Sequence, residues 1–295
     1  MSGFTLRLKQ AVNYPVVWIV TLLALFFAIG FFFIRNDIDT LIADKLPLLF
    51  TEQMLWYILV GFGAQMVDGA LGMAYGVCSS TFLMSVGVSP AAASASVHVA
   101  EIFTTGASAI AHFSLKNVNK RLFKALVIPA VLGGIVGAYL LSSIDGEIVK
   151  PYVNIYLFIM GVVILRKALA PKIERSKVRR IGLLALVGGF LDSIGGGGWG
   201  PVVNSTLLSK GKTPRLIIGT VNSVEFFLTF ASAGVFTLFM GLQNVQIIVG
   251  LVLGGVVAAP FGAYLVGKVR TKPLMIMVGL LVCFLSLRTL YKVFL

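Results

Sequence analysis

Charged residues are scarce in this sequence. Only 12% of its residues are Asp, Glu, Lys or Arg, whereas 58% are hydrophobic and the mean hydropathy is +0.98. Soluble domains contain about 25% charged residues and roughly 45–50% apolar ones. A single globule of 295 residues cannot bury this excess of apolar side chains. The composition therefore excludes a soluble enzyme and a disordered chain, and we expect an integral membrane protein that is not an enzyme.

Cysteine and histidine are also rare. Cys78 and Cys283 both lie in apolar runs and form no CxxC motif, disulfide framework or metal-binding spacing. The two histidines, His98 and His112, share one apolar run, and the second half of the chain has none. Paired haem ligands and matched redox cysteines are therefore missing. The sequence predicts no metal site and no cofactor, and a membrane redox protein is the weakest of the alternatives.

Acidic residues are outnumbered, with 11 against 24 basic ones and a net charge of +13. Such an excess can indicate a nucleic-acid partner. Here, however, the basic residues fall in short gaps between apolar runs, which is typical of membrane proteins. The expected partners are therefore the lipid bilayer and a small anionic substrate, with protons as a candidate coupling ion and no nucleic acid.

Long apolar runs divide the chain. A run of about 20 apolar residues is needed to cross a bilayer. Seven unbroken candidates occur, at residues 15–34, 90–114, 122–144, 151–169, 214–240, 244–266 and 273–291. Two further apolar regions, 53–86 and 181–209, are interrupted by Asp and Gly. Their pieces of about 13–17 residues correspond to roughly 20–26 Å of helix, which favours re-entrant hairpins over full spans.

The second half of the chain repeats the first at a shift of 124 residues. The matched pairs are Asp68 and Asp192, Gly72 and Gly196, Tyr75 and Trp199, Gly76 and Gly200, Pro90 and Pro214, and Glu101 and Glu225. Gly and Pro recur by chance in membrane helices. The two acids and the aromatic–Gly pair at one constant shift indicate a duplication.

Loop charges predict the orientation of the two copies. With the N-terminus in the cytoplasm, 19 of the 24 basic residues lie on the cytoplasmic side. The loop at 115–124 is basic and its counterpart at 241–245 is uncharged, whereas 87–90 is uncharged and its counterpart 210–215 is basic. The two halves are therefore expected to lie upside down relative to each other.

These patterns predict an all-α integral membrane protein of the inverted-repeat transporter class. Seven full spans plus two broken or re-entrant helical hairpins are expected, with eleven spans as the alternative. The expected parts are an N-terminal helix and acidic external segment (1–52), a first repeat (53–169), a basic cytoplasmic linker (170–180) and a second repeat (181–295). Substrate sites in such transporters lie near the bilayer midplane at broken helices.

The two breaks are the first candidate site. A new helix is expected after each break, and its free N–H groups and positive dipole end can bind an anion. The predicted substrate-binding residues are Asp68, Gly69, Gly72, Ser79, Asp192, Ser193, Gly195, Gly196, Gly197, Gly198, Trp199 and Asn222. The alternative is that Asp68 and Asp192 are ordinary helix N-caps and that the glycines serve packing.

A polar face on the helix after each break is the second candidate. Ser94, His98, Glu101, Thr105, Ser108 and His112 recur at helical spacing. The counterpart face holds Asn222, Glu225, Thr229 and Ser232. Ionisable groups inside a span usually face an interior or a watery path, so Glu101, Glu225 and His98 are candidates for proton coupling. The alternative is that the small polar residues hold helices together.

These segments resemble the sulfite exporter TauE/SafE family. Asp68 with its following glycines, and the stretch from Pro90 to Glu101, resemble the first family signature, and residues 188–225 resemble the second. The first break has Ala70, Met73 and Ala74 where family members commonly have more glycine. The resemblance covers about residues 55–295 and implies a bacterial or archaeal plasma-membrane permease for sulfite, sulfonates or related anions.

The functional prediction is a secondary transporter of a small oxyanion, either sulfite or an organosulfonate, that works by alternating access and is coupled to protons. It is expected to be a multi-pass protein of the cell membrane. A passive anion channel is the main alternative, and four intramembrane acids leave a cation permease open.

Overall fold

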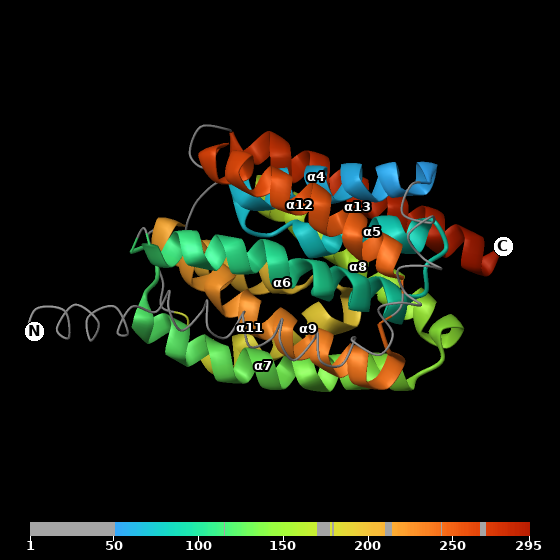
Figure 1. Ribbon diagram of the computed structural model, residues 1–295, viewed down its shortest axis with the longest axis horizontal. Helices are drawn as coiled ribbons and strands as arrows, with labels where there is room; N and C mark the ends of the chain where they lie inside the picture. Colours follow the sequence, from blue (N-terminus) through green and yellow to red (C-terminus); the bar gives the residue numbers. More distant parts are fainter. Residues whose placement is uncertain are drawn as a thin grey trace, which may run out of the picture.

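A computed structural model describes residues 51–295 except 115, 170–177, 179, 210–213, 243 and 266–269. The described residues form helices and no strands (Figure 1). The helices are α4 (Glu52–Leu71), α5 (Tyr75–Ser85), α6 (Pro90–Ser114), α7 (Lys120–Ser143), α8 (Gly146–Leu169), α9 (Ile181–Gly195), the π-helix η2 (Gly200–Asn204), α10 (Ser205–Ser209), α11 (Pro214–Met240), α12 (Val245–Leu265) and α13 (Thr271–Phe294). The expected span at 15–34 and most of the 1–52 and 170–180 segments lie outside the described residues.

The predicted all-α class is confirmed. Within the described part of the chain, four helices are long and apolar enough to cross a membrane: Lys120–Ser143, Gly146–Leu169, Arg215–Met240 and Lys272–Phe294. Two shorter apolar helices, Ile181–Gly195 and Val245–Ala259, accompany them. Large apolar side chains such as Tyr152, Leu238 and Phe284 are exposed, whereas carboxylates, serines and an imidazole are buried. An apolar exterior around a polar interior suits lipid rather than water.

The first broken region forms a helical hairpin, but its break lies later than the sequence suggested. Helix α4 continues through Asp68 and Gly69 to Leu71, and its 20 residues exceed the expected length. Gly72 ends the helix at φ 67°, a left-handed conformation that glycine adopts without strain. The start of α4, at Gln53, and the loop after α5, at Val86, line one depression. Helix α5 therefore returns to the end of the molecule from which α4 starts (Figure 1).

The second broken region repeats this local geometry. Helix α9 has 15 residues, and Gly196 follows it at φ 64°, again left-handed. The returning arm begins as the π-helix η2 and continues as α10. Ile181 and Leu208, near the two ends of this hairpin, pack on the same hydrophobic cluster. Both hairpins thus consist of a longer entering arm, a left-handed glycine and a shorter returning arm.

Each entering arm packs against a helix of the other half. Helix α4 lies along α12, where Gly254 meets the backbone of Ile58. Helix α9 lies along α7, where Gly189 meets the backbone of Ala130. Glycine at these crossings lets the backbones approach closely, as is common between membrane helices. At the shift of 124 residues α4 corresponds to α9 and α7 to α12, so the two contacts are the same contact exchanged between the halves.

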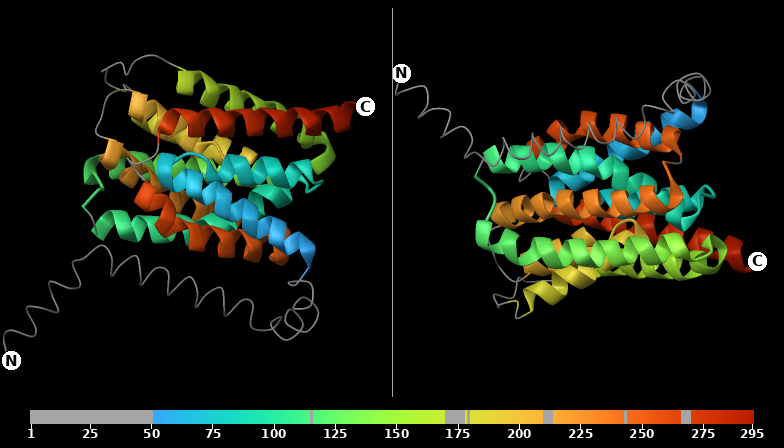
Figure 2. Two further views of the ribbon diagram at one scale, coloured as in Figure 1. Left: turned by 90° about the horizontal axis from the view of Figure 1, so that it is seen from above. Right: turned by 60° about the horizontal axis from the view of Figure 1, so that its bottom comes forward.

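The remaining helices pair with their own counterparts in antiparallel fashion. In the α6–α11 pair, His98 packs on Phe236, and Asn222 donates a hydrogen bond to Ser108. In the α8–α13 pair, Gly161 meets Cys283 and Gly279 meets Leu165. The views in Figure 2 show α8 and α13 running side by side in opposite directions. The two breaks lie at the centre of this arrangement.

Candidate functional site

The carboxylates of Asp68 and Asp192 cap the returning arms. Asp68 Oδ1 accepts hydrogen bonds from the amides of Ala74 and Tyr75 at 2.8 and 3.4 Å. Asp192 Oδ1 accepts from Gly198 and Trp199 at 2.7 and 2.8 Å. The carboxylates therefore cap the returning arms, but they act from six and seven residues away and are not the ordinary N-caps of the sequence alternative. The first amides of each returning arm are occupied by a carboxylate, contrary to the expectation that they are free for an anion.

Hydrogen bonds also join the two breaks. Ser80 Oγ in α5 donates to the carbonyl of Gly196 at 2.7 Å. Asn204 Nδ2 in η2 donates to the carbonyl of Gly72 at 2.5 Å. Ser80 and Asn204 are equivalent at the 124-residue shift, and so are Gly72 and Gly196. One hydrogen bond is thus made twice, with the equivalent residues of the two hairpins exchanged.

The backbones of the two hairpins are in direct contact where the hairpins cross. A Cβ on Gly197 would lie 2.1 Å from the amide nitrogen of Val77, and one on Gly76 would lie 2.6 Å from the carbonyl oxygen of Gly196. A Cβ on Gly200 would lie 2.3 Å from the Cα of Met73. These glycines allow the crossing, since any larger residue would push the two breaks apart.

Ionisable groups gather around this crossing. Asp68, Glu101, Asp192, Glu225 and His98 are all buried, with His98 fully enclosed. No Lys or Arg is buried among the residues that the structure describes. The centre therefore offers four carboxyl groups and one imidazole, so a bound anion there needs a compensating positive charge.

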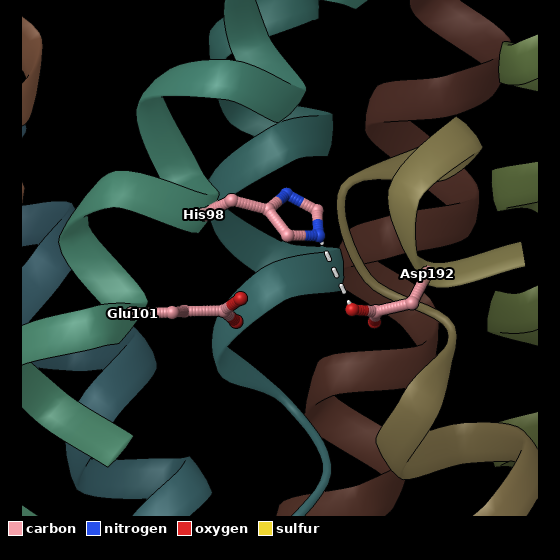
Figure 3. Close-up of side chains that lie close together, drawn as sticks. All are labelled: His98, Glu101 and Asp192. Carbon is pink, nitrogen blue, oxygen red and sulfur yellow. Dashed lines mark ion pairs between the residues drawn. The ribbon is translucent and has the colours of Figure 1, made fainter. Parts of the chain in front are cut away.

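His98 joins the two halves. Its Nδ1 lies 2.8 Å from the carbonyl oxygen of Ser94, one turn earlier in α6. Its Nε2 lies 3.3 Å from Asp192 Oδ2 in the second half (Figure 3). Glu101 lies on the same face of α6, and its Oε2 has no hydrogen-bond partner. Donor atoms of His98, Glu101 and Asp192 all lie within 4.8 Å of one another, which makes these residues the candidates for holding a metal ion.

Several predicted site residues have other contacts. The Ser193 hydroxyl is 2.7 Å from that of Ser232, which agrees with the interpretation of small polar residues as contacts between helices. Trp199 is fully buried in a hydrophobic cluster, and its Nε1 donates to the carbonyl of Val221. Gly69 lies within α4 rather than at the break. Ser79 Oγ and Asn222 Oδ1 are buried without a hydrogen-bond partner, and therefore remain candidates for substrate contact.

Four residues at the site were not predicted from the sequence. Ser80 and Asn204 carry the reciprocal hydrogen bonds, and their 124-residue spacing was a signal that could have revealed them. The buried hydroxyl of Tyr156 has no partner and lies beside Gly198. Lys167 in α8 donates to the carbonyl of Pro201 at 3.0 Å and contacts Ser205. Nothing in the local sequence connects either residue with the second hairpin.

A buried polar centre between two broken helical hairpins, surrounded by an apolar exterior, defines the class of multi-pass membrane transport proteins. Comparisons with known proteins agree. Residues 57–289 match the family described as sulfite exporter TauE/SafE. The chain is also similar to the probable membrane transporter protein YtnM of Bacillus subtilis (strain 168), with 38% identity over 249 residues, covering 81% of this chain and 83% of that protein. No solved structure matches the chain significantly.

The chain therefore belongs to the TauE/SafE sulfite exporter family. The resemblance predicted from the two break segments is confirmed, and so is a membrane permease as the general function. The family and the relative are described as transporters, which fits the expectation that the chain is not an enzyme.

Proposed function

We propose that this protein is a secondary transporter of a small oxyanion, sulfite or an organosulfonate, and that the two hairpins form its gate. The reciprocal contact between the breaks is the observation that carries the proposal. Because Ser80 and Asn204 hold the opposite break, a movement of one half against the other exposes both breaks together. Such a paired exposure is what alternating access around a central site needs.

The anion is proposed to bind beyond the capping carboxylates. Asp68 and Asp192 already accept hydrogen bonds from the first amides of each returning arm. The amide of Val77 is covered by Gly197 in this structure, and separation of the breaks uncovers it. Ser79 Oγ and Asn222 Oδ1 lie buried without partners. The Ser79 hydroxyl is a suitable donor to an oxyanion. Asn222 can offer only the second N–H of its side-chain amide, because Nδ2 already donates to Ser108 and Oδ1 is an acceptor.

The two halves, 53–169 and 181–295, are proposed to be inverted repeats with the basic segment 170–180 between them. Inversion places the start of α8 outside the cell and the start of α13 in the cytoplasm. We expect Glu147→Cys to react with an impermeant maleimide added to intact cells, and Lys272→Cys to react only after permeabilisation. Both native side chains are exposed. Labelling of both from the same side would refute the inversion, and a variant lacking Cys78 and Cys283 supplies the background.

Protons are the proposed coupling ion, and Glu225 is the proposed carrier. Its side chain is buried in α11, and no Lys or Arg is buried among the residues that the structure describes. Proteoliposomes containing the wild-type protein should take up labelled sulfite faster under a pH gradient. Glu225→Gln should retain downhill flux and lose the dependence on the gradient, because a glutamine cannot carry a proton.

Protein-free liposomes measure the leak of sulfur dioxide across the lipid, which must be subtracted. A wild-type rate that does not respond to the gradient would remove proton coupling and leave the permease intact. A large single-channel current would favour the passive channel instead. Flux no greater than in protein-free liposomes, for sulfite and for a panel of sulfonates, would refute the oxyanion proposal.

A further inference from the structure

Three buried donor atoms converge at the centre of the molecule. His98, Glu101 and Asp192 point toward one another from α6 and α9 (Figure 3). Each is at least 98% buried. His98 Nε2, Glu101 Oε2 and Asp192 Oδ2 all lack a hydrogen-bond partner. Buried polar atoms in native proteins are nearly always satisfied, so three that converge on one point favour a shared ligand.

The His98 imidazole is oriented so that its Nε2 can act as an acceptor. Its Nδ1 is 2.8 Å from the Ser94 carbonyl oxygen, which can only accept, so Nδ1 carries a proton. In the neutral ring, the lone pair is then on Nε2, which faces Asp192. Metal-binding histidines are commonly oriented in this way, with the second nitrogen donating to a backbone carbonyl.

The contact between His98 and Asp192 has the spacing of two ligands on one ion. Nε2 and Oδ2 are 3.3 Å apart, yet neither atom is in a hydrogen bond. An aligned, charged hydrogen bond would be shorter, about 2.7–2.9 Å. Two atoms bound to a tetrahedral Zn²⁺ at about 2.0–2.2 Å are separated by roughly 3.3–3.5 Å. Glu101 has a ligand atom within 4.8 Å of both, and a closer approach of its carboxylate completes a set of three ligands.

The other half of the protein supplies an internal comparison. At the 124-residue shift, Asp192 corresponds to Asp68, Glu101 to Glu225 and His98 to Asn222. The counterpart cluster therefore has both carboxylates and no imidazole. Because a carboxamide is a poor ligand for zinc, whereas imidazole is a good one, the two clusters should differ in metal binding.

We propose that His98, Glu101 and Asp192 bind a divalent transition-metal ion, with Zn²⁺ as the best fit. One nitrogen and two oxygen ligands suit Zn²⁺ and leave the fourth position open, as in sites where a substrate or water completes the coordination. The ion also supplies positive charge at a centre that has four carboxyl groups. That the open position takes an oxygen of the transported anion is a corollary, and this corollary alone rests on the proposed function.

The test is Co²⁺ binding to the full chain, purified in detergent without a polyhistidine tag and stripped with a chelator. Co²⁺ in a site of low coordination number gives visible absorption bands, and Zn²⁺ should displace it. We expect about one Co²⁺ per wild-type chain. His98→Asn, which places the residue of the second half in the first, should lose the bands, as should Glu101→Gln.

Glu225→Gln is the matched control, since it makes the same change in the cluster that lacks histidine, and it should retain the bands. Size-exclusion profiles establish that each variant is folded. Equal Co²⁺ binding by the wild type and His98→Asn would overturn the proposal, and so would a wild type that binds neither Co²⁺ nor Zn²⁺. Sulfite flux after chelation separates the two ideas, because flux that persists without metal leaves the transporter proposal standing.

Discussion

Replacement of Gly197 by alanine should reduce transport at least about tenfold. A Cβ at this position would lie 2.1 Å from the amide nitrogen of Val77 and 2.4 Å from the carbonyl carbon of Gly76. Both are backbone atoms, so no side chain can rotate away, and the two hairpins must separate. Overpacking of this kind typically costs about 1–3 kcal/mol. At the crossing it also breaks the closed contact of the gate, and we expect sulfite flux below about a tenth of the wild-type rate.

The matched control is Gly63→Ala in α4. A Cβ on Gly63 meets no atom within 4 Å. Alanine is favoured over glycine inside a helix by about 1 kcal/mol, so this variant should be as stable as the wild type or more so, with unchanged flux. The measurement is initial flux at equal amounts of reconstituted protein. A Gly197→Ala protein that transports at the wild-type rate would show that the hairpin crossing is not part of the gate.

The helices of this fold follow from the sequence to within a few residues. The run predicted at 90–114 is helix α6, and that at 214–240 is α11. Continuous apolar runs determine such helices almost alone, because a backbone in lipid must satisfy its own hydrogen bonds. The correspondence between the two halves was also visible in the sequence, because Asp and Gly at the same spacing in both halves predict the same local structure. Both breaks have the same left-handed glycine and the same capping carboxylate.

The sequence could not predict which backbone amides already donate hydrogen bonds to a carboxylate. Asp68 and Asp192 were predicted to be near free amides, yet each carboxylate reaches amides six and seven residues ahead. An ordinary N-cap acts over two or three residues, so this longer loop has no simple sequence signal. His98 and Asp192 are far apart in the chain, and only the packing of α6 near α9 brings them together. Contacts of that kind depend on tertiary structure.

The second large effect is expected at Asp192. Substitutions by alanine and by asparagine separate the loss of the cap from the loss of the charge. Asp192→Ala removes both hydrogen bonds to Gly198 and Trp199 and leaves two buried amides unsatisfied. Hydrogen bonds to a charged group contribute about 1.5–3 kcal/mol each, so we expect a loss of about 3 kcal/mol or more. At about 2–4 °C per kcal/mol, the value for domains of about 150–250 residues, the apparent Tm in detergent should fall by roughly 6–12 °C. A Tm equal to that of the wild type would disprove the cap.

Asp192 has a second role, which is the contact of its carboxylate with His98. Asp68 is the comparison that tests this role. Because Asp68 makes the same cap, Asp68→Ala and Asp192→Ala should lower the Tm by similar amounts. The asparagine variants keep an oxygen for the cap and remove only the charge, so both should fold. Asp192→Asn alone also changes the group that faces His98, since the position equivalent to His98 in the second half is Asn222. Transport and Co²⁺ binding should therefore fall much further in Asp192→Asn than in Asp68→Asn, and equal losses would mean that the imidazole adds nothing to the site.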